Sequence, residues 1–235
     1  VAPGDILIRH IGYDKVTPYE QILTAKNPSR SINIAIVAEG YTEEEMDIFL
    51  ADCNVAMDAL FAHEPFKTKK DRFNIIAVKS PSCDSGTSEP ANGMWKNTAL
   101  SSHFNTFYQD RFLTTLHLKD LHDILAGTPY EHIIVLVNTE KYGGGGILNS
   151  YTLVAAHSAK MRPVVVHEFG HSFAGLGDEY HYDDEEMSMY PLDIEPWETN
   201  IPPMVDFDSK WKDMMGTDGV DLIEGAGYCA RGIYR

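Results

Sequence analysis

Hydrophobic and polar positions follow two different patterns along the first half of the chain. Short runs rich in β-branched apolar residues occupy residues 31–40, 73–78 and 132–138, and each predicts a strand. Between the first two runs, apolar residues recur every three or four positions over residues 46–61, which predicts a helix with one buried face. The chain therefore alternates strand and helix from its first apolar run onward.

The predicted helix has a start signal, and a second helix is expected further along. Thr42 and Glu45 have the spacing of a capping box ahead of the apolar series, and Pro65 follows its end. Residues 104–125 predict another helix before the third strand. Strand, helix, strand, helix and strand in this order favour an α/β (α+β) fold.

Four consecutive glycines follow the third strand and raise two interpretations. A phosphate-binding loop would need a Lys-Ser/Thr pair and a helix after residues 143–146, and neither follows. The alternating run of residues 147–157 instead predicts a turn into an exposed edge strand. From residue 182 the chain is acidic and rich in proline, then in glycine, and predicts loops and short helices. We expect one domain over residues 1–235, with a lead-in at 1–30 and an irregular part at 182–235.

Composition excludes several classes of function. The chain of 235 residues carries 19 Lys and Arg against 35 Asp and Glu, a formal net charge of −16. Such a charge repels phosphate backbones and anionic membranes, so nucleic acid is not an expected partner. The longest apolar runs are strand-sized, well below the ~20 residues that a transmembrane helix needs.

Cysteine content and the chain ends bear on the compartment. Cys53, Cys83 and Cys229 are an odd number without CxxC spacing, so at least one is expected to lack an intramolecular partner. The chain begins at Val1 without a signal segment, and Arg235 ends an apparently unfinished stretch, so we expect a processed or cut chain. The acidic, lysine-poor composition is compatible with export.

Residues 167–180, HEFGHSFAGLGDEY, carry two overlapping hydrolase patterns. Residues 170–174 resemble the G-x-S-x-G nucleophile elbow of serine esterases, with Ser172 as nucleophile. On that fold the base is a histidine that follows both the serine and the acid, and His181 is the single histidine after Ser172. Nine residues are too few for it to reach the serine from a distant loop, so we reject the serine interpretation.

The metal interpretation uses the HEFGH part of the same stretch. With Pro163 as the first helical residue, His167 and His171 lie at i and i+4 on one helix face and can share one ion. Glu168 projects about 100° round the helix, where a carboxylate can take a proton from metal-activated water. The alternative without a metal is a surface helix with two solvated histidines. Apolar residues throughout the stretch predict instead a helix buried all round, whose histidines need a partner such as zinc.

A catalytic zinc needs a third protein ligand and one open position. Gly175 can end the helix in a left-handed conformation and return the chain to the metal. Asp178 is then the expected third ligand, and Glu179 is the alternative.

The stretch resembles the metzincin clan of metallopeptidases, whose motif is HExxHxxGxxH or HExxHxxGxxD. This chain has one more residue before the glycine and reads HExxHxxxGxxD. Together with VAEGYT at 37–42, EGAGY at 224–228 and the terminal RGIYR, the stretch resembles the bacterial IgA-specific metallopeptidase family. This resemblance implies a secreted or cell-surface zinc endopeptidase of metzincin-like fold, with a central active-site helix and often a preceding β-rich domain.

The resemblance also implies further site elements. An antiparallel edge strand over residues 144–153 would pair with extended substrate through its backbone, at Gly144, Gly145, Gly146 and Ile147. A methionine turn is also expected, with Met204, Met214 and Met215 as candidates that we leave unassigned.

A tyrosine follows the predicted ligand loop directly. Tyr180 can either donate a hydrogen bond to a developing oxyanion or simply pack the loop.

The predicted function is hydrolysis of protein or peptide substrates by a zinc-dependent endopeptidase with Glu168 as general base. The alternative from another class is an extracellular binding module with a structural zinc site. A closed structural site would have a fourth protein ligand and no use for Glu168.

Overall fold

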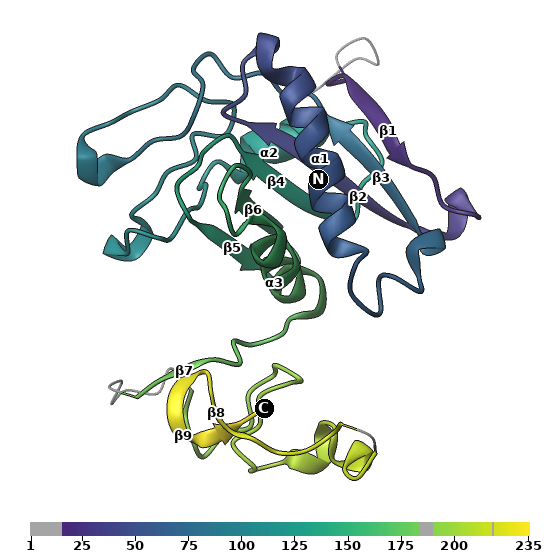
Figure 1. Ribbon diagram of the computed structural model, residues 1–235, viewed down its shortest axis with the longest axis vertical. Coiled ribbons are helices and arrows are strands. Elements are labelled where there is room, and N and C mark those ends of the chain that lie inside the picture. The colour runs from purple at the N-terminus through teal and green to yellow at the C-terminus, as the bar shows by residue number, and fades with distance from the viewer. Residues whose placement is uncertain (1–15, 184–189, 218) are drawn as a thin grey trace, which may run out of the picture. The chain divides into compact units, whose positions relative to one another are not determined.

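The computed structural model describes residues 16–183, 190–217 and 219–235 (Figure 1). The chain divides into two compact units, Val1–Phe173 and Ala174–Arg235, and each is described by itself. Parts of the predicted lead-in and of the predicted irregular C-terminal part lie outside the described residues. The prediction of a single domain stays a prediction.

The first unit is built on a six-stranded mixed sheet with strand order β1-β3-β2-β4-β6-β5. Its four central strands are parallel, and both edge strands, β1 and β5, run antiparallel to their neighbours. The mixed sheet with an antiparallel edge confirms the predicted α/β fold class. The strands are β1 (Tyr19–Leu23), β2 (Ile32–Glu39), β3 (Phe73–Val78), β4 (His132–Val137), β5 (Gly144–Ile147) and β6 (Tyr151–Ala155).

Helices cover both faces of this sheet (Figure 1). Helices α1 (Met46–Leu60) and α3 (Met161–Ala174) share one core cluster with alternate residues of the central strands. Helix α2 (Leu118–Leu125) and the loop before it pack on the opposite face. Short 3-10 turns complete the unit: η2 (Pro28–Arg30), η3 (Glu43–Glu45), η4 (Lys70–Arg72), η5 (Pro90–Asn92) and η6 (Thr106–Tyr108).

The start of α1 follows the predicted capping box. The backbone N–H of Thr42 donates a hydrogen bond to Glu45 Oε2 at 2.8 Å, and the Thr42 side chain accepts one in return from the backbone of Glu45. These two bonds satisfy N–H groups that the first helical turn leaves without a partner. The chain enters through one 3-10 turn before the regular helix.

The predicted helix over residues 104–125 is wrong for most of its length, because only Leu118–Leu125 is α-helical. Asn105, Phe107 and Tyr108 have φ angles of 67°, 53° and 61°, which no right-handed helix contains. The apolar residues that suggested a helix are buried by a loop instead, since Phe104 packs in the core below the sheet.

The predicted edge strand over residues 144–153 is also corrected. The edge strand β5 ends at Ile147, and the chain turns back into β6, which lies inside the sheet between β4 and β5. All five residues of β6 are buried, so the alternation that suggested an exposed strand does not reflect exposure. A parallel strand covered on both faces has no polar side to reveal it.

The second unit contains a small sheet with strand order β7-β9-β8. Its core cluster consists of Ile201, Ala226, Cys229 and Ile233. The sequence predicted the loops and short helices of this region and missed the sheet. Its elements are β7 (His181–Tyr182), η7 (Phe207–Ser209), η8 (Lys212–Met214), β8 (Glu224–Ala226) and β9 (Tyr228–Tyr234).

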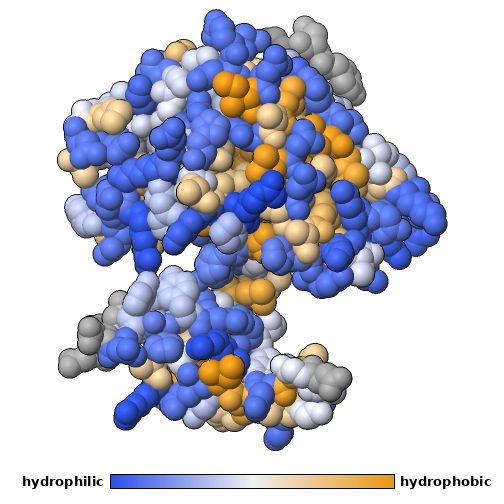
Figure 2. Space-filling view, viewed as in Figure 1, coloured by the Kyte–Doolittle hydropathy of each residue, from blue (hydrophilic) through white to orange (hydrophobic). Residues whose placement is uncertain are grey.

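The surface of the first unit is largely hydrophilic on the face that Figure 2 shows, with apolar residues between the hydrophilic ones. Among the described residues, no helix has both the length and the apolar character needed to cross a membrane. Cys53, Cys83 and Cys229 are all free thiols, and Cys83 is the exposed one.

Candidate metal centre

Helix α3 carries the histidine pair, and its start differs slightly from the prediction. The helix begins at Met161, two residues before Pro163. Pro163 therefore lies in the first turn, where its missing N–H is still tolerated. The helix ends before Gly175, whose φ of 63° confirms the predicted left-handed termination.

The predicted burial of α3 on all sides is wrong, because the helix has two different faces. Val164, Val165 and Phe169 are buried against the sheet and α1. His167 is exposed, and Glu168 and His171 are partly exposed. The candidate metal-binding side chains thus lie on the more exposed side of the helix, while Val165 and Phe169 fix the helix to the core.

The two histidines point their ring nitrogens at each other. His167 Nε2 and His171 Nε2 are 3.0 Å apart, and the ring planes stand at 87°. One ligand atom from each of His167, Glu168 and His171 lies within 4.8 Å of the others. Within the described residues, this is the group of histidine, cysteine and acidic side chains that meets the geometry for holding a metal ion.

The spacing of the two nitrogens fits a shared ion. Two imidazole nitrogens, each about 2.0–2.1 Å from a tetrahedral zinc, lie about 3.3 Å apart. The 3.0 Å separation of the Nε2 atoms is close to that value without any rearrangement of the helix. Imidazole nitrogens are also donors that suit zinc among the divalent metals.

The glycine run has a role that the sequence did not reveal. A Cβ on Gly146 would lie 2.1 Å from the Glu168 carbonyl oxygen and 2.9 Å from His171 Cβ, and one on Gly144 would lie 3.0 Å from Glu168 Oε1. Only glycine allows β5 to approach α3 this closely. The run was predicted as a turn into an edge strand, and β5 is that strand; the close packing of its glycines on the histidine helix was not predicted.

This packing places the predicted substrate-binding residues Gly144, Gly145, Gly146 and Ile147 on the strand beside the candidate metal-binding side chains. Gly144 forms an isolated parallel bridge with Phe112, so the beginning of the outer edge already has a neighbour. Ile147, at the other end of the strand, is 48% exposed. Their contact with a peptide stays a prediction.

Ser172 is a structural residue. Its side chain is buried, and its Oγ lies 2.5 Å from Thr152 Oγ1 of β6. Thr152 Oγ1 also donates to the Glu168 carbonyl oxygen at 3.3 Å, so the two hydroxyls connect α3 to the sheet. This geometry agrees with the rejection of the serine interpretation. The role of Thr152 was missed, although a lone polar residue inside an apolar strand was a signal.

The remaining predicted residues belong to the second unit. Tyr228 donates its hydroxyl hydrogen to Asp178 Oδ2, and Asn200 Nδ2 donates to Glu179 Oε1 at 2.9 Å. The Tyr180 hydroxyl donates to the Tyr228 hydroxyl at 3.2 Å, and burial raises the pKa of Tyr180 to about 12. The third-ligand role of Asp178 and the oxyanion role of Tyr180 stay predictions.

A further histidine of the first unit, His157, contacts the carboxylate of Asp52 away from the candidate metal centre. Its Nε2 lies 2.8 Å from Asp52 Oδ2, which also accepts a hydrogen bond from the Tyr41 hydroxyl at 2.7 Å. Burial raises the pKa of Tyr41 far above its usual range. This group connects the segment before α3 to α1 by hydrogen bonds.

A comparison with known protein families shows which family the chain belongs to. Residues 21–222 match the family model described as IgA Peptidase M64. The chain belongs to this family. Membership in the IgA peptidase M64 family confirms the resemblance inferred from the motif and places the chain among peptidases, hydrolases that act on proteins. A search of curated proteins gave no significant match.

Proposed function

We propose that this member of the IgA peptidase M64 family is a zinc-dependent endopeptidase. In this proposal His167, His171 and Asp178 hold the metal, and Glu168 is the general base. The observation that carries it is the 3.0 Å separation of the two Nε2 atoms with the Glu168 carboxylate beside them. The open position that catalysis requires would lie on the exposed face of α3.

The chemistry divides between the metal and the chain. A zinc ion held by these residues would lower the pKa of a bound water toward ~7 and polarise the substrate carbonyl. Glu168 would accept the proton of the attacking water and pass it to the leaving amine. The contacts of Phe169 in the core and of Thr152 with the Glu168 carbonyl hold this part of α3 in place.

Substrate would lie along β5. We propose that residues of this strand hold an extended peptide through backbone hydrogen bonds, because glycines leave the main chain accessible. The bridge between Phe112 and Gly144 leaves Gly145, Gly146 and Ile147 for that pairing. Tyr180 would donate a hydrogen bond to the oxyanion. The proposed substrates are proteins or peptides in general, met outside the cell by a secreted or surface-exposed enzyme.

The test is Glu168→Gln, which removes the base and keeps the shape of the side chain. We expect zinc content unchanged by elemental analysis and cleavage of a fluorogenic peptide library reduced about 10²–10⁴-fold. Glu44→Gln, at an exposed glutamate outside the site, is the matched control and should cleave normally.

Each outcome has a clear meaning. Full activity of Glu168→Gln with bound zinc would refute the general-base role. Zinc without any peptide cleavage in the unmodified chain would favour the alternative, a binding module with a structural metal.

A further inference from the structure

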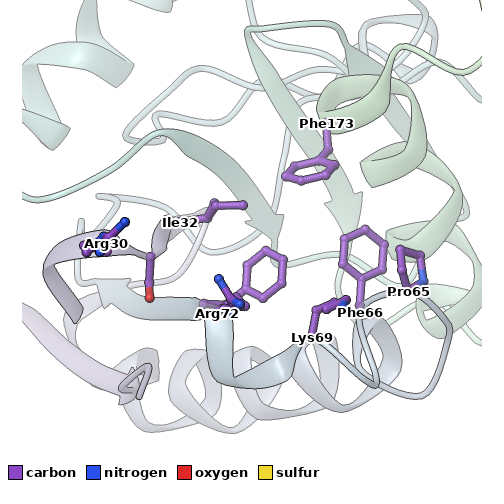
Figure 3. Close-up of a pocket in the computed structure, with 9 residues that line it drawn as sticks. Arg30, Ile32, Pro65, Phe66, Lys69, Arg72 and Phe173 are labelled. Atoms are coloured by element: carbon purple, nitrogen blue, oxygen red, sulfur yellow. The ribbon is translucent and has the colours of Figure 1, made fainter. Parts of the chain in front are cut away.

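A cavity of the first unit lies against the last turn of α3. It has a volume of about 380 Å³ and is lined by the side chains shown in Figure 3. Phe173 lines it, six residues after His167 and therefore about 240° further round the helix. The pocket thus occupies a side of α3 other than the one that carries the histidines, and no residue of the candidate metal centre lines it.

The inner wall of the pocket is aromatic. The ring centroids of Phe66 and Phe173 are 5.6 Å apart, and that of Phe73 lies 5.9 Å from Phe66 and 6.4 Å from Phe173. The three rings form a triangular cluster with tilted and edge-on contacts, which offers an apolar surface to a flat or hydrocarbon group.

The other side of the pocket is cationic. Arg30, Arg72 and Lys69 line it, and in the view of Figure 3 they lie in a row with Phe173 and Ile32 across from them. The parallel register explains this gathering, because Ile32 pairs with Phe73 at the first position of β2 and β3. Arg30 and Arg72 precede those residues and so meet at the same end of the sheet.

The three cations lack carboxylate partners in the described part of the chain. None of the ion pairs there, with a nitrogen-to-oxygen limit of 4.0 Å, involves Arg30, Lys69 or Arg72. The chain as a whole has a net charge of −16, so three cations around one pocket without carboxylate partners are unusual for it. Cations that line one pocket repel one another, and an anion bound in the pocket relieves that repulsion.

We propose that this pocket binds a small organic anion whose apolar body contacts the three phenylalanines and whose carboxylate contacts the cations. Charge complementarity selects the anion, since guanidinium groups match a planar carboxylate with paired hydrogen bonds. The volume lies within the range of about 300–1,000 Å³ that small-molecule sites occupy. The inference is independent of the proposed peptidase mechanism.

The probe is 2-naphthylacetate, with the neutral 2-naphthylacetamide as its matched control, titrated calorimetrically into the full chain. We expect saturable binding of one carboxylate per chain and about tenfold weaker binding of the amide. The double variant Arg30→Gln/Arg72→Gln should weaken carboxylate binding about tenfold and leave amide binding unchanged. Lys67→Gln, at an exposed lysine of the same loop that does not line the pocket, should bind as the unmodified chain does.

A carboxylate can also bind a catalytic metal, so the titration is repeated with chelator present and with the His171→Ala variant. Binding that survives both treatments supports the pocket. Binding that either treatment abolishes, equal affinity for acid and amide, no effect of the double arginine variant, or no saturable binding up to the solubility limit would each overturn the proposal.

Discussion

Two groups in the first unit combine histidine with a carboxylate, and their geometries differ. On α3, His167 and His171 direct their Nε2 atoms at each other, 3.0 Å apart, beside Glu168. Near the start of the same helix, His157 directs its Nε2 at Asp52, which also accepts the hydroxyl of buried Tyr41. The first group brings together two nitrogens with the spacing to bind one cation jointly, and the second brings together a donor and an acceptor.

This difference indicates that residue type alone does not distinguish a candidate metal site from a hydrogen-bonded structural group. The scaffold decides, because a helical i, i+4 spacing makes two nitrogens converge, whereas a loop and a neighbouring helix bring nitrogen to oxygen. The two groups also depend on different supports. Close packing of β5 holds the first, and hydrogen bonds hold the second.

The largest expected effect comes from removing histidines one at a time. His167→Ala and His171→Ala should each lose more than about a hundredfold in zinc affinity, measured by competition with a chelating dye, because a direct ligand is lost. His157→Ala should keep zinc and peptide cleavage and lose about 1–3 kcal/mol of unfolding free energy in urea. Zinc loss in His157→Ala would mean that the two groups are not distinct.

A smaller effect is expected from Gly146→Ala. The added Cβ would meet the Glu168 carbonyl oxygen at 2.1 Å, so β5 or α3 must shift, at a cost of about 1–3 kcal/mol in unfolding free energy. Gly145→Ala is the control, because its Cβ would meet only the Leu113 carbonyl oxygen, at 3.3 Å. Urea denaturation and zinc titration measure both variants, and equal effects would argue against packing of β5 as the support of the metal-binding group.

The smallest effect concerns His132, another histidine of the first unit, which packs against phenylalanine rings and so differs from the histidines of both groups. Its ring centroid lies 4.6 Å from that of Phe173, and burial lowers its pKa below 6.5. The unfolded chain therefore binds a proton more readily, so unfolding free energy should fall as pH drops below about 6.5 and level off below the folded pKa.

The control for this pH effect is His132→Gln, which removes the titrating ring. Between pH 7 and pH 5 its unfolding free energy should depend less on pH than that of the unmodified chain, as measured by urea denaturation at each pH. An identical slope in both proteins would exclude His132 as the source.

The sequence predicted what local patterns encode. The strands β2, β3 and β4 and the capping box of α1 follow from short-range signals, and the HEFGH spacing alone predicted the convergence of His167 and His171. These features need no knowledge of distant residues.

What the sequence could not predict depends on contacts between distant segments. The apolar residues near Phe104 suggested a helix, whereas the fold buries them from a loop under the sheet. The glycines of β5 matter because of α3, which follows them in the chain, and the pocket depends on the parallel register of Ile32 with Phe73. Asp178 was chosen by spacing from Gly175, a local argument that the geometry of the first unit does not test.

The two sides of α3 limit which mutations this helix can accept during evolution. Inserting or deleting a single codon between His167 and His171 would rotate everything beyond it by about 100°. The His171 ring would then no longer face that of His167, and the Phe173 ring would move out of the aromatic cluster at the same time. A substitution changes one side of the helix at a time, whereas an insertion or deletion changes both sides at once. The number of residues between His167 and Phe173 is therefore more constrained than the identity of most of them.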